Sequence, residues 1–398
     1  MSELTHAAII PLIGGLPLGV QQSFGRRPEY LLSYTPFFKN DEHLVKYYKE
    51  EVPYYQIDEG QIPSEGLKSV DVVSTTCPCA GLSSLSTSSG ADNVKNEWMY
   101  TTSRYVLEHM KPRVFFGENA PRLATETGKK VRDTLKNIGK EFGYTMLVYQ
   151  TKSLLHGIPQ VRDRTFYFFF REDHRVPVFP FYRKDYQSIE ELIRSVKNDP
   201  EDEPMNKNVP SEDLFYKFIL DKAGMTHKEF SDSLTKSSSI VRELERVYEA
   251  TFKDVAEWSQ ENGFDEKYYH QLMKKHKKLE AGGGIMRKGV CVPKDHIGAF
   301  VGHLPLRTVH PDEDRYLTVK ECMAIMKMPE DFEMIEPRRR LNHLCQNVPV
   351  TTARSMADMV KDYLTGKNPE FIECDFMMID NRNQRIHSVE SNTHGSLF

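Results

Sequence analysis

Three short stretches of the 398-residue sequence carry side chains whose chemistry is complementary. Cys77-Pro78-Cys79 offers a thiol, and Glu118-Asn119 offers a carboxylate beside an amide. Arg162 and Arg164 stand two residues apart beside an aromatic run, so both point to one side of a strand, a geometry that suits recognition of an anion or a base. A thiolate is a strong nucleophile, and a carboxylate can hold a proton while the nucleophile attacks. Together these residue types are compatible with covalent catalysis in which a cysteine is the nucleophile.

Each stretch taken alone has a simpler interpretation. Buried cysteines are common and usually inert, and Glu118-Asn119 is compatible with an ordinary turn. Cys77 and Cys79 resemble half of a metal site, but zinc takes four ligands and no second cysteine or histidine pair stands at ligand spacing. We therefore expect no metal. Six scattered cysteines are also too few for a disulfide framework in a chain of this length.

The elements that must position these residues are short apolar runs separated by helical patterns. The runs lie at 7–10, 30–34, 70–74, 114–117 and 165–170, and 41–50 carries a helical pattern. This alternation predicts a parallel sheet with helices on both faces. Ligands bind such sheets at the carboxyl ends of the strands. Gly14-Gly15, Cys79 and Glu118 each follow a run, so we expect them at one edge.

The composition of the chain changes after about residue 171. Residues 172–285 are polar, with helical patterns at 238–252 and 266–279, and Gly282-Gly283-Gly284 marks a joint. The chain becomes apolar again from about 297, with helical patterns near 318–326 and 351–363, and we expect a loosely packed polar tail at its end. We expect a catalytic domain in two parts, 1–171 and 300–365, which are separated by a variable insert at 172–299 and followed by the tail at 366–398.

Composition describes an ordinary globular protein, with 39% apolar and 28% charged residues and room for two or three domains. No run of 18 apolar residues is present, and Met1-Ser2-Glu3-Leu4 lacks the pattern of a secretion signal. We therefore expect a cytoplasmic protein. The net charge of −4 means that any binding to nucleic acid depends on a local basic patch.

Pro78-Cys79, Glu118-Asn119 and the stretch from Gln160 to Arg164 resemble, in this order, the motifs of the cytosine-C5 DNA methyltransferases. Residues 315–321 and 328–332 are similar to the family segment after the recognition domain, and Gln346-Asn347-Val348-Pro349 is similar to its closing motif. The chain is identified as a divergent member, of phage or bacterial type. The resemblance implies an α/β, Rossmann-like S-adenosylmethionine-dependent methyltransferase sheet with a large inserted, mainly helical target-recognition domain.

The resemblance also implies the roles of the catalytic residues. Cys79 would attack C6 of a cytosine flipped out of the duplex, so that C5 becomes reactive toward a methyl group. Glu118 would contact the ring nitrogen N3, Arg164 would contact the base carbonyl, and Arg162 would support the loop or a phosphate. The implied activity is that of a DNA (cytosine-5-)-methyltransferase of the restriction-modification kind.

The implied cofactor is S-adenosyl-L-methionine, although the turn at residues 10–15, which would bind it, departs from the family pattern. The family has Phe-x-Gly-x-Gly-Gly, whereas residues 10–15 keep only the final glycine pair, with Leu12 at the first glycine. Thr35-Pro36 stands where the family has a ribose-binding acid, and Asp58 is the counterpart of its adenine-contacting acid. The predicted cofactor-binding residues are Ile10, Gly14, Gly15, Asp58, Pro78 and Asn347.

The implied partner is double-stranded DNA, which would place the protein at the nucleoid. Two basic runs in the insert favour this partner, although a solvated helix face explains each run as well. We expect a monomer with no obligate protein partner and no membrane association. The predicted DNA-binding residues are Ser83, Gln160, Lys274, Lys275, Lys277, Lys278, Arg287 and Lys288.

Two other functions remain open on the sequence. The altered turn at 10–15 is compatible with a relative that transfers a different one-carbon group to C5. It is equally the first change expected in a non-catalytic DNA-binding paralogue, although such a protein would have no need of Cys79, Glu118 and Arg164. An RNA substrate shares the same base chemistry, and the insert favours a duplex only by analogy.

Overall fold

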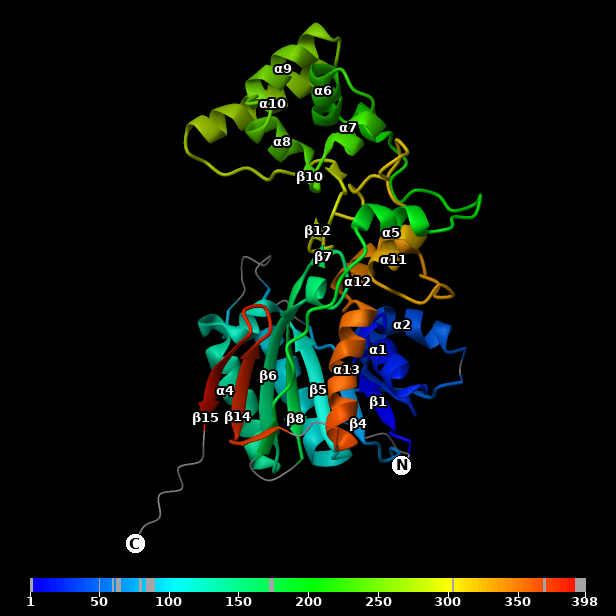
Figure 1. The fold of residues 1–398 in the computed structure, drawn as a ribbon, viewed down its shortest axis with the longest axis vertical. Helices are drawn as coiled ribbons and strands as arrows, with labels where there is room; N and C mark the ends of the chain where they lie inside the picture. Colours follow the sequence, from blue (N-terminus) through cyan, green and yellow to red (C-terminus); the bar gives the residue numbers. More distant parts are fainter. Residues whose placement is uncertain are drawn as a thin grey trace. The chain divides into compact units, whose positions relative to one another are not determined.

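The structure, a computed structural model, describes residues 3–49, 51–58, 61, 66–78, 81–83, 90–171, 175–302, 304–367 and 370–390. The chain forms two compact units (Figure 1). The first, here called the sheet unit, comprises Met1–Tyr186, Met326–Glu336 and Gln346–Phe398. The second, here called the helical unit, comprises Gln187–Ile325 and Pro337–Cys345. These boundaries differ from the expected insert at 172–299, because the helical unit begins later and also takes in two segments beyond residue 299.

A nine-stranded sheet forms the centre of the sheet unit, in the order β15-β14-β6-β8-β5-β4-β1-β2-β3 (Figure 1). Neighbouring strands are parallel except where β8 lies between β5 and β6 and where β15 pairs with β14. The expected α/β class is confirmed, with antiparallel members that the runs alone did not reveal. The strands are β1 (His6–Ile9), β2 (Leu31–Tyr34), β3 (Tyr54–Ile57), β4 (Val72–Thr75), β5 (Val114–Asn119), β6 (Thr145–Lys152), β8 (Asp163–Phe170), β14 (Phe376–Asp380) and β15 (Arg385–Glu390).

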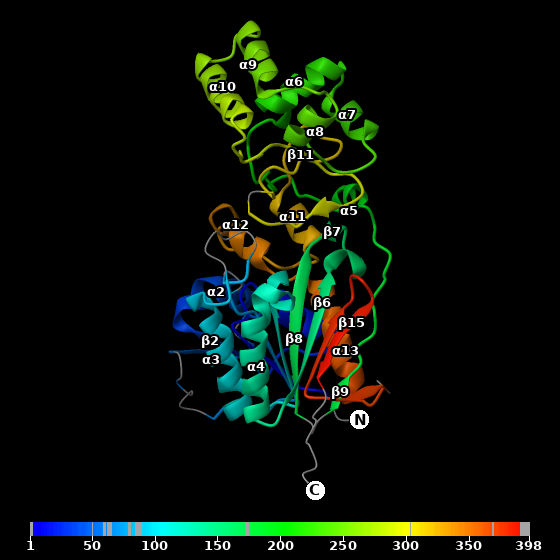
Figure 2. The ribbon, with the colours of Figure 1, turned by 90° about the vertical axis from the view of Figure 1, so that its left-hand side faces the viewer.

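Helices cover both faces of this sheet (Figure 2). Along β8, Phe166, Phe168 and Phe170 belong to the core under α1 and α13, whereas Tyr167 and Phe169 belong to the core under α3 and α4. This division follows the two-residue period of a strand, and it explains why the run is apolar throughout. The helices of the sheet unit are α1 (Gly15–Phe24), α2 (Phe38–Tyr47), α3 (Glu97–Tyr105), α4 (Lys129–Glu141) and α13 (Val350–Leu364).

The segment expected to be a loose tail contributes strands to the sheet. Residues 371–373 form β13 (Phe371–Glu373), which pairs with β9 (Arg175–Pro177), and β14 pairs with the edge of β6. Met377 and Ile379 are fully buried. The physical reason is that a short apolar run in a polar context can cover an open strand edge, which would otherwise expose unpaired backbone groups.

The helical unit is built around its own core, which joins α6, α8, α9 and α10 through residues such as Ile219, Leu244, Val255 and Leu272. Of the helix expected over 238–252, only Ile240–Arg246 forms a continuous helix, and a new helix begins at Phe252, where Thr251 accepts the Asp254 N–H in a capping box. The elements are α5 (Ile189–Ser195), α6 (Leu214–Ala223), α7 (His227–Ser233), α8 (Ile240–Arg246), α9 (Phe252–Glu261), α10 (Glu266–Glu280), α11 (Val319–Ile325), α12 (Pro337–Gln346) and the short strands β10 (Ser238–Ser239), β11 (Cys291–Val292) and β12 (Ile297–Gly298).

Among the described residues, no helix combines the length and apolar character needed to cross a membrane.

Candidate active site

The carboxyl ends of β1, β4 and β5 lie side by side, because these strands are neighbours and parallel. Residues 76–78 continue from β4, and Glu118 lies at the end of β5. Cys79, the predicted nucleophile, lies outside the described residues. Its neighbour Pro78 is half-buried.

Cys77 is packed into the core beneath this edge. Its Sγ lies 3.5 Å from the Thr75 Oγ1, and the Tyr167 hydroxyl donates to it at 3.9 Å. Burial raises the pKa of the Cys77 thiol, so this cysteine stays neutral and makes a poor nucleophile. Of the two cysteines in the motif, Cys77 therefore has a structural environment.

Glu118 and Arg164 form a buried ion pair between β5 and β8. The Arg164 Nε lies 2.5 Å from the Glu118 Oε1, and the side chains are 12% and 2% exposed. Within the described part of the chain neither of these atoms makes an aligned hydrogen bond, so the contact is one of charge. Burial raises the pKa of Glu118, while Arg164 and Arg162 oppose the shift. The site can therefore offer a ring nitrogen a carboxyl group that is ready to share a proton.

Arg162 faces inward instead of toward solvent. It is fully buried, and its Nη2 donates to the Asn347 carbonyl at 2.9 Å. The Asn347 side-chain oxygen in turn accepts the Gly15 N–H at 2.8 Å. Arg162 thus ties the arginine motif to the closing segment and to the start of α1. This arrangement matches support of the site more closely than direct contact with a phosphate.

The turn after β1 contains two non-glycine residues in the left-handed region, Ile10 at φ 50° and Leu12 at φ 51°, followed by Gly14 at φ 103°. Left-handed backbone costs an ordinary residue about 1 kcal/mol or more, so something must hold this turn. Asp41 does so, because its buried carboxylate accepts the Leu12 N–H at 2.9 Å. The Tyr54 hydroxyl also donates to Asp41, at 3.1 Å.

Asp41 is the supporting residue that the sequence interpretation missed, since the helical pattern at 41–50 assigned it no role. Burial raises the pKa of Asp41 to about 7. The available signal was its place on α2, where Leu44 follows at i+3 and Tyr48 at i+7 on the apolar side of the helical pattern. An acid on an apolar helix stripe needs a buried hydrogen-bond partner.

The residues around this turn fit S-adenosyl-L-methionine by their chemistry. Helix α1 begins at Gly15, and a helix N-terminus favours a carboxylate such as that of a methionine group. Asp58 follows β3 and is exposed, and the Thr35 hydroxyl donates to it at 3.0 Å. A carboxylate and a hydroxyl at adjacent strand ends suit a ribose or an adenine amine. The glycines also serve the protein itself, since a Cβ at Gly15 would lie 1.9 Å from the Val348 carbonyl oxygen.

The predicted DNA-binding residues have differing environments. Gln160 is fully buried and its Nε2 contacts the Met326 Sδ at 3.6 Å, whereas Ser83 is half-buried. Arg287 is engaged by both carboxylate oxygens of Glu245 at 3.0 and 2.8 Å. Lys288 is exposed, as are three of the four predicted lysines on α10: Lys274, Lys277 and Lys278, with Lys275 half-buried. The role of each of these residues in binding DNA stays a prediction.

A mainly parallel sheet with helices on both faces and polar groups at its carboxyl edge is the architecture of an α/β protein that binds its ligand at the strand ends. Residues 9–362 match the model of the C-5 cytosine-specific DNA methylase family, and the chain belongs to that family. The expected family is thus confirmed.

Two individual relatives are less than 30% identical to this chain over the stretches that align. It is 28% identical to the type II methyltransferase M.HhaI of Haemophilus parahaemolyticus over 45% of this chain and 54% of that protein. It is 23% identical to the type II methyltransferase M1.HphI of the same organism over 90% of this chain and 87% of that protein. The match to M.HhaI thus spans about half of that relative's length.

A solved structure described as a DNA modification methyltransferase from an E. coli prophage aligns with a TM-score of 0.57 and 14% identity. It covers 91% of this chain and 99% of its own. At this identity, the likeness shows the fold alone.

Proposed function

We propose that this protein is a DNA (cytosine-5-)-methyltransferase that acts on double-stranded DNA. The observation that carries the proposal is the buried Glu118–Arg164 pair at the carboxyl edge of the sheet, in a chain whose residues 9–362 match the family. A buried acid beside a guanidinium suits a flat ring that offers a nitrogen and a carbonyl oxygen, as cytosine does at N3 and O2.

The proposed chemistry begins with extrusion of the cytosine from the stack, which costs a few kcal/mol. The Cys79 thiolate adds to C6, forming a C–S bond and making C5 electron-rich. Glu118 holds a proton at N3, and Arg164 stabilises charge at O2. After C5 has been substituted, the C5 proton leaves to a base, the electron pair restores the ring, and the C6–S bond breaks to release Cys79.

Bound S-adenosyl-L-methionine would supply an electrophilic methyl group. In this proposal Gly14 and Gly15 bring the backbone and the α1 N-terminus close to the methionine end. Asp58, Ile10 and Pro78 contact the nucleoside, and Asn347 keeps the turn in place through the Gly15 N–H. These residues bind and orient the donor and exclude water from the reacting groups.

The test is incorporation of tritiated methyl groups from S-adenosyl-L-methionine into duplex DNA. The wild-type protein should label DNA, and Cys79→Ala should abolish labelling. Glu118→Gln keeps the shape but loses the charge, and its rate should fall about 100-fold or more. The matched control Glu126→Gln, at an exposed position, should keep the wild-type rate. A wild-type protein that labels no DNA and forms no denaturant-resistant complex with 5-fluorocytosine DNA would overturn the proposal.

A second candidate keeps the base chemistry but uses a different one-carbon donor. The observation that favours it is Leu12, whose side chain occupies the turn at φ 51° where the family has glycine. A side chain there reshapes the space next to a ligand. Calorimetry with S-adenosyl-L-methionine separates the two candidates, because tight binding of this compound removes the reason for a different donor.

A further inference from the structure

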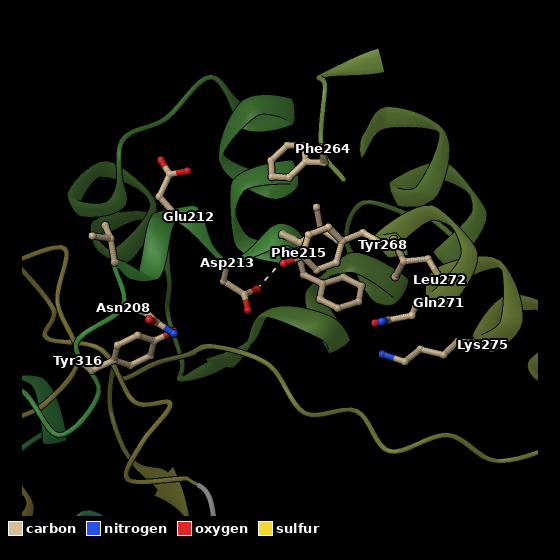
Figure 3. A pocket seen from close by; sticks show the side chains of 12 residues that line it. Asn208, Glu212, Asp213, Phe215, Phe264, Tyr268, Gln271, Leu272, Lys275 and Tyr316 are labelled. Atoms are coloured by element: carbon tan, nitrogen blue, oxygen red, sulfur yellow. Dashed lines mark hydrogen bonds between the residues drawn. The ribbon is translucent and has the colours of Figure 1, made fainter. Parts of the chain in front are cut away.

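The helical unit contains a pocket of about 500 Å³ that the proposed methyl transfer does not use (Figure 3). It lies between residues 208–215 and helix α10. Figure 3 shows Asp213 near its middle, with Asn208 and Tyr316 on one side and Phe215 and Tyr268 on the other. Its volume is within the range of small-molecule sites in proteins.

Three aromatic rings of the pocket each have a lysine ammonium over one face. The Nζ atoms of Lys275, Lys217 and Lys267 lie 5.8, 5.8 and 5.1 Å from the ring centroids of Phe215, Phe264 and Tyr268. Aromatic platforms interleaved with positive charge are the arrangement by which proteins bind unpaired nucleotides, because bases stack on the rings while the charges attract phosphates.

The lysines differ in how far their charge is already neutralised. Lys217 is paired with Glu212 at 2.8 Å and Lys267 with Asp265 at 2.8 Å. Lys275 makes no ion pair with any residue that the structure describes. It projects next to Gln271 in Figure 3. Lys275 is therefore the cation of this pocket that is available to a phosphate.

Asp213 supplies a hydrogen-bond acceptor beside the aromatic rings. Its Oδ1 caps α6 by accepting the N–H groups of Phe215 and Tyr216 at 3.2 and 3.3 Å. Oδ2 accepts no hydrogen bond from the described residues. Burial raises the pKa of Asp213, which reflects the cost of keeping this carboxylate from water. A ligand with adjacent N–H donors would reduce that cost.

We propose that this pocket binds one unpaired nucleotide of the DNA and prefers guanine. Guanine presents two neighbouring N–H donors, at N1 and N2, to an acceptor such as Asp213. Adenine and cytosine place an acceptor next to their amino group, and thymine places its single donor between two carbonyls. The base stacks on Phe215 and Tyr268, and Lys275 contacts the phosphate. This inference goes beyond the proposed methyl transfer and does not depend on Cys79.

The probe for this site is the set of four deoxynucleoside monophosphates, added to the full chain. Trp258 reports on the pocket, since its ring lies 5.4 Å from that of Phe264. The sequence has two tryptophans, so Trp98→Phe leaves Trp258 as the sole indole fluorophore. Saturation-transfer NMR measures the same titrations independently of fluorescence. We expect saturable binding of dGMP, with an affinity about fivefold or more above that of dAMP, dCMP and dTMP, and none of inorganic phosphate.

Three substitutions test the assignment. Tyr268→Ala removes a stacking ring and should weaken dGMP binding about tenfold or more. Asp213→Asn keeps a good helix cap and should abolish the preference for guanine while leaving weak binding. Lys275→Ala should weaken the binding of all four nucleotides, whereas Lys253→Ala, at an exposed position outside the pocket wall, should not.

Equal binding of the four nucleotides, no binding by either method, or binding unchanged in Tyr268→Ala and Asp213→Asn would each overturn the proposal. Methyl transfer to duplex DNA is measured on the same preparations. A protein that methylates DNA but does not bind dGMP excludes only the pocket proposal. One that binds dGMP without methylating DNA excludes only the proposed enzymatic activity.

Discussion

Two buried carboxylates in the sheet unit have different electrostatic surroundings, although burial raises the pKa of both. Glu118 lies against Arg164, and the field of Arg162 also reaches it, so positive charge offsets part of the cost of burial. The hydrogen-bond donors to Asp41, the Leu12 N–H and the Tyr54 hydroxyl, are neutral. Burial therefore dominates at Asp41 and raises its pKa to about 7. One carboxylate is paired with an arginine, and the other holds the turn after β1.

Stability should consequently depend on the protonation of Asp41. Its pKa is about 7 in the folded protein and about 4 in an unfolded chain, so the folded state binds the proton more tightly. The stabilisation that protonated Asp41 gives the folded state is complete below about pH 4 and is lost as the pH rises to 7. Over this interval the free energy of unfolding falls by no more than about 1.4 kcal/mol per pH unit. Asp41→Asn retains an acceptor for the Leu12 N–H and removes the titration.

Urea unfolding of the wild type and Asp41→Asn between pH 4 and 7.5 measures the effect as the difference between the two proteins. The free energy of unfolding of the wild type should fall relative to that of the variant as the pH rises. Parallel curves over the whole range would show that Asp41 does not titrate in this interval.

At the scale of elements, α1 and α13 pack so closely that glycine is required between them. A Cβ added at Gly19 would lie 2.5 Å from the Ala353 Cβ and 2.6 Å from the Arg354 backbone nitrogen. Backbone atoms cannot rotate aside, so the helices would have to separate. The same contact keeps α13, and the Asn347 that precedes it, against the turn after β1.

Gly19→Ala should therefore destabilise the protein by about 1–3 kcal/mol, as measured by the urea midpoint. Helix propensity alone predicts the opposite sign, because alanine is favoured over glycine by about 1 kcal/mol inside a helix. The sign of the change thus decides between packing and propensity. Gly284→Ala, where no described heavy atom lies within 4 Å of the new Cβ, is the control and should change stability little.

At the scale of the whole molecule, a net charge of −4 opposes association with DNA. Any binding must then rest on local basic surface, and the run at 274–278 on α10 provides four lysines in five residues. Lys277 and Lys278 are exposed and make no ion pair with the described residues. Lys228, in the same unit, is paired with both Asp232 and Asp312.

Replacing Lys277 and Lys278 together by alanine should lower the slope of log K against log salt for a DNA duplex by about 1.8, since each phosphate contact contributes about 0.9. Fluorescence anisotropy at several potassium chloride concentrations measures the slope. Lys228→Ala should leave it nearly unchanged, because its charge is already neutralised. An unaltered slope in the double variant would place the DNA away from this part of α10.

The strands that position the candidate site could be predicted from the sequence because their evidence is local. The apolar runs before Gly14, Pro78 and Glu118 indicated strand ends, and the aromatic run at 165–170 indicated a buried strand. Hydrophobic periodicity is a property of neighbouring residues, so one sequence is enough to detect it. The order of the motifs then indicated the family, which residues 9–362 confirm.

The tertiary structure alone decided which distant residues meet. Gly15 and Asn347 are 332 residues apart, yet one hydrogen bond joins them. Three other contacts also join residues that are far apart in the sequence. Arg162 donates to the Asn347 carbonyl, Asp41 accepts the Leu12 N–H, and β14 pairs with β6. Burial of a polar side chain or a strand edge without a hydrogen-bond partner is too costly, so the local sequence pattern can show that a partner is needed. Which residue becomes the partner depends on the packing of the whole chain.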